Sequence, residues 1–288
     1  MLVRLLFTQY SIIPTFHHSI ADTWCCIRIP NGVTGMLTFI SIIFGAMVGS
    51  FLNVCIIRLP KEESIIVPGS HCPHCKTHIK FYDNIPLISY LLLGAKCRYC
   101  HEAISIQYPL IEGIAAVSSL LLFIKFGPSL SYLFYFSFVA ALITITVIDL
   151  FHQIIPDVIS LPGIGIGLLA SLVIPHQTFF NSLIGTLCGG GSLFLVATLY
   201  QWWFKREGMG GGDVKFLAMI GAFLGWKSVI LTILLSSLIG STTGIMIMVL
   251  KGKDFKYAIP FGPFLSVGAV ISLFYQNEII SWYLQFKG

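Results

Sequence analysis

The stretch that decides the fold is Ile145-Thr-Val-Ile-Asp149-Leu-Phe-His-Gln-Ile-Ile-Pro-Asp157, in which a long apolar run ends on an acid and a polar turn. A second stretch, Glu207-Gly-Met-Gly-Gly-Gly-Asp213-Val-Lys215, places another acid just before an apolar run. Ionisable side chains at membrane depth are costly and are usually retained for a function. The two acids therefore indicate a paired-carboxylate site in a membrane protein.

The composition is that of a membrane protein. Of the 288 residues, 56% are hydrophobic and 10% are charged, and the mean hydropathy is +0.88. Such a chain must satisfy its backbone hydrogen bonds inside lipid, and the uninterrupted apolar runs favour helices over a barrel. We expect an all-α polytopic membrane protein with about eight transmembrane helices, at roughly 37–57, 104–126, 130–149, 158–175, 179–203, 214–226, 228–250 and 261–284.

Basic residues mark one side of this predicted bundle. They gather after the first, fifth and seventh spans, which an eight-span path places together: Arg58, Lys61, Lys76, Lys80, Lys96, Arg98, Lys205, Arg206, Lys251, Lys253 and Lys256. Cytoplasmic loops carry an excess of Lys and Arg, so this side, with Asp149 and Asp213 near it, is predicted to face the cytoplasm. The net charge of +5 reflects topology. No basic surface interleaved with aromatic residues indicates nucleic acid as a partner.

The polar loop 58–103 contains two Cys-x-x-Cys pairs, Cys72 with Cys75 and Cys97 with Cys100. Two such pairs allow four thiolates to surround Zn²⁺ tetrahedrally. We predict a structural metal, because a closed four-cysteine site has no open position for catalysis and a short loop has little core. Disulfides are the alternative, but a cytoplasmic loop is a reducing environment.

Several motifs, taken in order, resemble the type IV prepilin peptidase family, which are bacterial membrane aspartic proteases of the Gly-x-Gly-Asp class. They cover roughly residues 37–265. The matching stretches are Gly49-Ser-Phe-Leu-Asn-Val54, Arg58-Leu-Pro60, the two cysteine pairs, Tyr108-Pro-Leu-Ile-Glu112, Asp149 with Ile155-Pro-Asp157, the stretch from Glu207 to Lys215, and Pro260-Phe-Gly-Pro263. A lone Gly-x-Gly-Asp would be a weak signal, whereas the ordered set is highly specific.

The resemblance implies an enzyme that removes the short basic leader of prepilins and pseudopilins at the cytoplasmic face of the bacterial inner membrane. It also implies N-methylation of the new N-terminal residue with S-adenosylmethionine. Its substrates would serve type IV pili or type II secretion, and its other partner is membrane lipid. By position, Asp149 and Asp213 match the family's two catalytic aspartates. No glycine-rich nucleotide fingerprint is present, so methylation rests on the resemblance, and the residues that bind the methyl donor are unknown.

These features divide the chain into four parts. Residues 1–36 form an N-terminal extension of uncertain order, and residues 37–57 form the first transmembrane helix. Residues 58–103 form the cytoplasmic zinc-binding loop domain, and residues 104–288 form the membrane aspartic peptidase domain.

Peptide hydrolysis by two carboxylates needs one ionised group to take a proton from water and one protonated group to polarise the scissile carbonyl. Like charges a few ångströms apart do not both ionise easily, so the pair shares a proton. Asp149 ends a helix, where carbonyl dipoles disfavour a negative charge, whereas Asp213 begins one. Asp149 is therefore predicted to carry the proton more often. Gly210, Gly211 and Gly212 are predicted to let an extended substrate approach closely.

Three more residues are candidate substrate contacts. Glu207 is placed to attract the cations of the leader, and Lys215 to tune the acid pair or bind lipid phosphate. Glu112 lies inside the second span, where it either lines a water-filled or cofactor pocket or pairs internally. Helix capping is the alternative role for Asp213, and we expect Asp157 to be the N-cap of the fourth span.

A proton-coupled membrane transporter is the main alternative function. In that case Asp149 and Asp213 would be protonation sites, and glycine-rich breaks beside membrane carboxylates do occur in transporters. The sequence shows no inverted repeat, and both acids are predicted near one face rather than midway across the membrane. Both features argue against transport.

Overall fold

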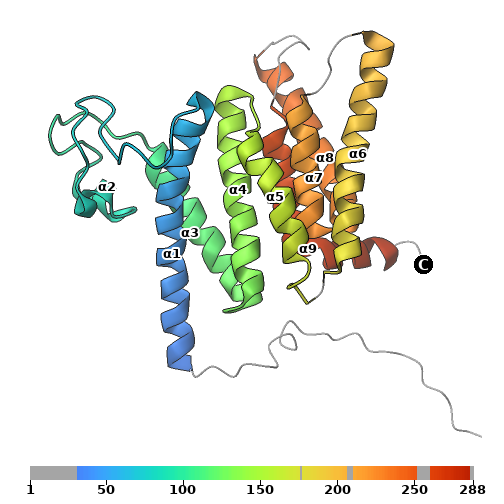
Figure 1. Cartoon of the computed structure of the whole chain (residues 1–288), viewed down its shortest axis with the longest axis horizontal. Helices are drawn as coiled ribbons and strands as arrows, with labels where there is room; N and C mark the ends of the chain where they lie inside the picture. Colours follow the sequence, from blue (N-terminus) through green and yellow to red (C-terminus); the bar gives the residue numbers. More distant parts are fainter. Residues whose placement is uncertain (1–30, 176, 206–209, 252–259, 286–288) are drawn as a thin grey trace, which may run out of the picture.

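The computed structural model of the chain describes residues 31–175, 177–205, 210–251 and 260–285. These residues form helices joined by turns, with one larger irregular segment between α1 and α3 (Figure 1). Extended pairing in this part of the chain is confined to two isolated bridges, His71 with His78 and Lys96 with Ala103. The predicted all-α class is confirmed.

The helices follow the order expected from hydropathy. Their bounds are α1 Asn31–Arg58, η2 Leu59–Lys61, η3 Phe81–Asn84, α2 Ile88–Leu92, α3 Gln107–Phe126, α4 Leu130–His152, α5 Asp157–Ala170, α6 Phe179–Phe204, α7 Gly211–Leu224, α8 Trp226–Lys251 and α9 Gly262–Gln285. The first helix begins at Asn31, earlier than the predicted residue 37. The rest of the predicted extension, residues 1–30, lies outside the described residues.

Six of these helices, α1, α3, α4, α6, α8 and α9, are long and apolar enough to cross a membrane. The other two predicted spans are also helical, but α5 and α7 have 14 residues each. At 1.5 Å per residue each is about 21 Å long, against a hydrocarbon core of about 30 Å. The structure therefore supports six spanning helices, and the predicted count of eight stays a prediction.

The short helix α7 lies within the bundle rather than against lipid. Every residue from Phe216 to Leu224 is buried. Glycines allow this close packing: a Cβ on Gly221 of α7 would collide with the carbonyl oxygen of Gly185 on α6. On the other side, a Cβ on Gly167 of α5 would lie 2.9 Å from the Cβ of Ala222. Small residues at such contacts let membrane helices approach one another without side-chain clashes.

The span predicted for 261–284 is present as α9, which is long and apolar enough to cross a membrane, but this helix contains a break. It is broken at Tyr275 (φ −128°, ψ 15°). The ammonium of Lys125 on α3 donates to the carbonyl oxygens of Leu273 (3.0 Å) and Phe274 (2.6 Å), which sit at the break. Past it, the end of α9 turns aside from the bundle (Figure 1). The sequence did not predict this contact, because the ammonium comes from a helix distant along the chain.

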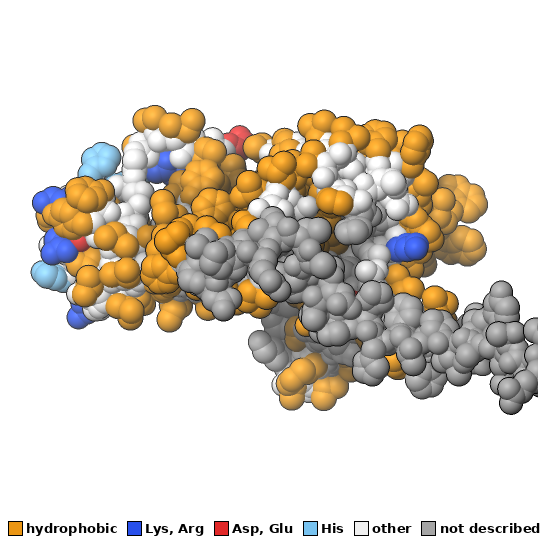
Figure 2. All heavy atoms as spheres, turned by 90° about the horizontal axis from the view of Figure 1, so that it is seen from below, with side chains coloured by type: hydrophobic (Ala, Val, Ile, Leu, Met, Phe, Trp, Pro, Cys, Tyr) orange, Lys and Arg blue, Asp and Glu red, His pale blue; other side chains and the backbone are white. Residues whose placement is uncertain are grey.

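The surface agrees with a membrane location. Figure 2 shows hydrophobic side chains over most of the visible face of the helices, with Lys, Arg and His side chains mainly at the end formed by the segment between α1 and α3. Large side chains such as Leu187, Phe194 and Ile245 are exposed on α6 and α8. Apolar groups turned outward in this density are expected where lipid is the solvent.

Candidate active site

Asp149 lies in the last turn of α4 and is 5% exposed. Its backbone carbonyl accepts the N–H of Gln153, which adopts a left-handed conformation (φ 55°) and ends the helix. Its side chain turns to α9, where the N–H of Gly262 donates to Oδ2 at 2.9 Å. The backbone of Asp149 therefore belongs to the end of α4, whereas its carboxylate contacts the beginning of α9.

Asp213 is the third residue of α7, and it is partly buried. The N-cap of this helix is Gly210, and the N–H of Asp213 donates to the Gly210 carbonyl at 3.2 Å. The alternative that Asp213 serves as the N-cap is therefore wrong, because the residue already lies inside the first helical turn.

The fold brings the two predicted catalytic acids to the same end of the bundle. The C-terminal end of α4 and the N-terminal end of α7 lie on the same side as the segment between α1 and α3 (Figure 1). Farther along the two helices, the rings of Phe138 and Phe223 stack with centroids 4.7 Å apart. The charge of Asp149 acts on Asp213 across this end of the bundle. A shared proton requires two carboxyl groups that influence each other in this way.

The glycines before Asp213 have different surroundings. A Cβ on Gly212 would lie 2.9 Å from the Cβ of Ile155, so this position is closely packed. Among the described residues, nothing lies within 4 Å of a Cβ on Gly211, and Gly210 has a single neighbour at 4.0 Å. The first two glycines are therefore not packed against the described helices, whereas Gly212 is packed against Ile155. Glu207 lies outside the described residues.

Lys215 and Asp157 join the start of α7 to the start of α5. The Lys215 ammonium lies 2.7 Å from Oδ2 of Asp157. The N-cap of α5 is Pro156, without a side-chain capping bond, so the prediction that Asp157 is the N-cap is wrong. The ion pair was not predicted because it depends on the packing of α5 against α7.

Glu112 sits where the cysteine loop meets the membrane helices. It is 7% exposed, and its Oε2 accepts the N–H of Leu87 at 2.7 Å. One turn earlier on α3, the carbonyl of Tyr108 accepts from Nδ2 of Asn53 on α1 at 3.1 Å. Glu112 also lines a cavity of about 430 Å³ beneath the loop. It therefore lines a cavity and is also bonded within the protein, and its role toward a cofactor stays a prediction.

The four predicted metal ligands converge. The Sγ atoms of Cys72, Cys75, Cys97 and Cys100 all lie within 4.8 Å of one another, and those of Cys72 and Cys100 are 3.8 Å apart. Four sulfurs at about 2.3 Å from a tetrahedral zinc ion stand about 3.8 Å from one another. All four cysteines are free. The donor set fits a structural Zn²⁺ site.

The two cysteine pairs have the same backbone arrangement. In the first, the N–H of Cys72 donates to the Thr77 carbonyl, the Cys72 carbonyl accepts the N–H of Lys76, and the chain turns through Lys76 (φ 58°). In the second, the N–H of Cys97 donates to Glu102 and the chain turns through His101 (φ 59°). Hydrogen bonds from Thr77 lower the pKa of the Cys75 thiol to about 6, whereas desolvation and the neighbouring thiols raise the pKa of Cys100 to about 12. Donors held in this way favour the thiolate, which is the form that binds metal.

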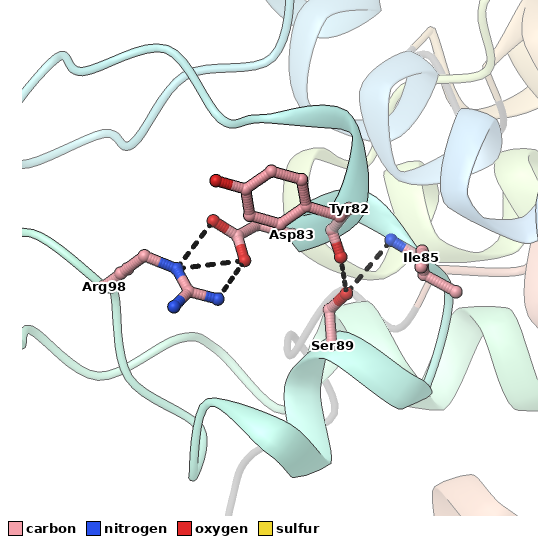
Figure 3. A network of polar contacts seen from close by, with 5 residues as sticks. All are labelled: Tyr82, Asp83, Ile85, Ser89 and Arg98. Atoms are coloured by element: carbon pink, nitrogen blue, oxygen red, sulfur yellow. Dashed lines mark hydrogen bonds and ion pairs between the residues drawn. The ribbon is translucent and has the colours of Figure 1, made fainter.

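A polar network links the second cysteine pair to the rest of the loop (Figure 3). Arg98 binds both carboxylate oxygens of Asp83, with Nε 2.9 Å from Oδ2 and Nη2 2.5 Å from Oδ1. Beside it, the Ser89 hydroxyl donates to the Tyr82 carbonyl at 2.9 Å and accepts the N–H of Ile85 at 3.1 Å. The Arg98 guanidinium lowers the pKa of Asp83, so this ion pair persists well below neutral pH.

Sequence reasoning assigned no role to Gly262, although it noted the stretch from Pro260 to Pro263. The sequence does contain a signal for Gly262, because this glycine lies between Pro260 and Pro263 at the start of an apolar run. Its meaning depends on the position of α4, which no local pattern reveals.

Comparison with known proteins agrees with the resemblance. The chain matches the Bacterial Peptidase A24 N-terminal domain over residues 43–126 and the Type IV leader peptidase family over residues 136–245. Relatives named prepilin leader peptidase/N-methyltransferase include proteins from Pseudomonas aeruginosa (37% identity, 86% of this chain and 93% of the relative), Legionella pneumophila (36%, 84% and 92%) and Aeromonas hydrophila (34%, 90% and 97%). No solved structure matches. Since the identity extends over most of each pair of sequences, the chain belongs to the type IV leader peptidase family.

Proposed function

We propose that this protein is a membrane aspartic endopeptidase that cleaves the basic leader from prepilins and pseudopilins at the cytoplasmic face of the bacterial inner membrane. The observation that carries the proposal is the meeting of Asp149 and Asp213 at one end of the bundle, with their charges in mutual reach. The names of the relatives support the same substrate class.

The chemistry needs one ionised and one protonated carboxyl group. The ionised partner takes a proton from a water molecule, and the resulting nucleophile attacks the scissile carbonyl. The protonated partner donates to the carbonyl oxygen as negative charge develops there. Gly210 and Gly211, which are not packed against the described helices, give an extended peptide access to Asp213. The pair then exchanges roles as the leaving amine takes up a proton.

The substrate suits the position of this site. A prepilin leader is basic and cytoplasmic, while the helix that follows it is apolar and stays in the bilayer. The peptide bond between them lies at the membrane interface, which is where the proposed eight-span topology places the acid pair. The transporter alternative is not favoured, since the relatives are named as peptidases.

The test is leader removal from a prepilin by the purified protein in detergent. Asp149→Asn and Asp213→Asn keep the shape of each side chain and remove its acidity. Each is expected to lower the cleavage rate by at least about 10²-fold, the lower range for acid–base catalysis. Glu278→Gln, an acid beyond the break in α9, is the control and keeps the parent rate. Full cleavage by either aspartate variant would remove that residue from the mechanism.

We also propose that the chain methylates the new N-terminal residue, as the relatives' names indicate for those proteins. S-adenosylmethionine would supply an electrophilic methyl group on a sulfonium ion. The cavity of about 430 Å³ beneath the cysteine loop fits such a donor, because Tyr90, Tyr99, Tyr108 and Glu112 line it. Aromatic faces and a carboxylate attract a sulfonium cation.

Mass spectrometry of the mature N-terminus tests methyl transfer separately from cleavage. The parent is expected to add the methyl mass only when S-adenosylmethionine is supplied. Glu112→Gln is expected to lower methylation while leader removal continues. Methylation at the parent rate by this variant would exclude Glu112 from the donor site.

A further inference from the structure

We propose that the backbone N–H of Gly262 holds Asp149 as the ionised partner of the acid pair, so that Asp149 is the general base and Asp213 the general acid. This inference rests on the proposed peptidase function and assigns the two roles within it. It reverses the assignment expected from the end of α4 alone.

The first step is the position of Gly262 in α9. It is the first residue of that helix, and the carbonyl of Phe261 accepts the earliest helical bonds, from Phe264 and Leu265. The N–H of Gly262 therefore has no partner within the helix. It donates instead to Oδ2 of Asp149 at 2.9 Å.

The second step is the reason for a glycine. A Cβ at this position would lie 2.6 Å from Oδ2 and 3.2 Å from Cγ of Asp149. Any side chain would thus displace the carboxylate from the N–H. The close approach of backbone to carboxylate requires Gly262.

The beginning of α9 also stabilises a negative charge on Asp149. A hydrogen bond from an N–H to an ionised carboxylate is about twice as strong as one between neutral groups, and the beginning of a helix carries a partial positive charge. Asp149 receives both from α9. Its place at the end of α4 matters less, because the carbonyl beside it is already bonded to Gln153. The hydrogen bonds of the described residues include none to the carboxylate of Asp213.

The fourth step is the alignment of α4 with α9. One turn from Asp149 and Gly262, the hydroxyl of Thr146 donates to the hydroxyl of Ser266 at 2.7 Å. Ser266 is 5% exposed. This bond holds α4 and α9 in a fixed axial position relative to each other. It therefore keeps the N–H of Gly262 aligned with Oδ2 of Asp149.

Other ionisable groups on the surrounding helices are engaged elsewhere. Lys215 on α7 pairs with Asp157 on α5. Arg58 on α1 donates to the carbonyls of Ser64 and Pro68, and Glu112 on α3 accepts from Leu87. His152 on α4 is exposed. Among the described residues, Asp213 is the ionisable side chain that faces Asp149, so the Gly262 donor decides which of the two carboxyl groups holds the negative charge.

The test titrates Asp149 directly. Difference infrared spectroscopy follows the carboxyl band of Asp149 in an Asp213→Asn background, and Asp149→Asn identifies the band. Adding Gly262→Ala is expected to move the midpoint of that band about one to two pH units upward, the effect of losing one hydrogen bond to a charged group. Gly268→Ala is the matched control: it adds the same methyl group to α9, 2.9 Å from the Thr232 carbonyl, and leaves the midpoint in place.

The pH profile of kcat/KM tests the role in catalysis. In otherwise unchanged enzyme, Gly262→Ala is expected to shift the acidic limb upward by a similar amount, and Gly268→Ala to leave it. Ser266→Ala is expected to shift the acidic limb in the same direction by a smaller amount. Ser266→Thr, which keeps the hydroxyl, is expected to leave the limb at its position in the parent. If Gly262→Ala does not fold, the comparison of Ser266→Ala with Ser266→Thr tests the assignment.

An unmoved band midpoint, or a limb that moves to lower pH, would overturn the assignment. If Gly262→Ala moves the midpoint of the Asp149 band but the parent protein cleaves no prepilin, the peptidase function on which the assignment rests would be refuted instead.

Discussion

The cysteine loop and the helical bundle are built on different principles. Between Leu59 and Ile106, Cys72 and Ser89 are the buried residues, and large side chains such as Phe81 and Leu91 are 87% and 77% exposed. In the bundle, by contrast, α7 is buried along most of its length and its neighbours approach it through glycines. The bundle is thus held by its own packing, whereas the loop depends on a few bonds and on its four thiols.

The largest expected effect is a loss of stability confined to the cysteine loop. Cys72→Ser removes a thiolate from the proposed zinc site, where metal binding is worth about 10 kcal/mol or more of folding free energy. We expect loss of zinc, measured by elemental analysis, and rapid proteolysis of the loop. Cys188→Ser, which changes an exposed cysteine on α6, is the control and keeps both properties. A zinc-free loop that stays protected would show that the metal does not stabilise it.

A second substitution breaks the bundle and should spare the metal. Gly221→Ala places a methyl group against the carbonyl of Gly185 at the contact of α6 with α7. Overpacking of this kind costs about 1–3 kcal/mol, so the thermal midpoint in detergent should fall while zinc content stays at the parent value. Gly191→Ala, where nothing lies within 4 Å, should leave the midpoint unchanged. Parallel loss of zinc would mean that loop and bundle fold as one unit.

The smallest expected effect sharpens the account of the loop. Asp83→Asn removes the ion pair with Arg98, whose side chain is 51% exposed and therefore screened by salt. Because the pKa of Asp83 is lowered, the pair contributes above the ordinary carboxyl pKa and is lost as pH falls below it. At pH 7 we expect slightly faster amide exchange in the loop. High salt should produce the same change in the parent and none in the variant; an equal salt response in both would contradict the pair's role.

Hydropathy and motif spacing were sufficient to predict the helices, the acid pair and the cysteine cluster. Each of these depends on local pattern: an apolar run of sufficient length, an acid at its end, or paired cysteines two residues apart. The order of the runs along the chain then determines which ends meet. Asp149 and Asp213 could be placed together on that basis alone.

Long-range polar contacts could not be predicted. The carbonyls at the break in α9 accept from Lys125 of α3, and the partner of Lys215 depends on how α5 packs against α7. The donor to Asp149 comes from α9, more than a hundred residues away. The prediction that Asp149 carries the proton took account of the dipole of α4 but not of α9. It therefore omitted the N–H of Gly262, which contacts the carboxylate.

The shortness of α5 has a consequence for the surrounding bilayer. Its side chains at Val158, Leu161 and Leu169 are exposed on the surface of the bundle, yet the helix is about 10 Å shorter than the hydrocarbon core of a typical bilayer. Hydrophobic mismatch of this size draws the lipid headgroups inward at that point. Under the proposed function, this thinning would let water and the polar leader reach the acid pair, and the prepilin would not have to leave the membrane to be cleaved.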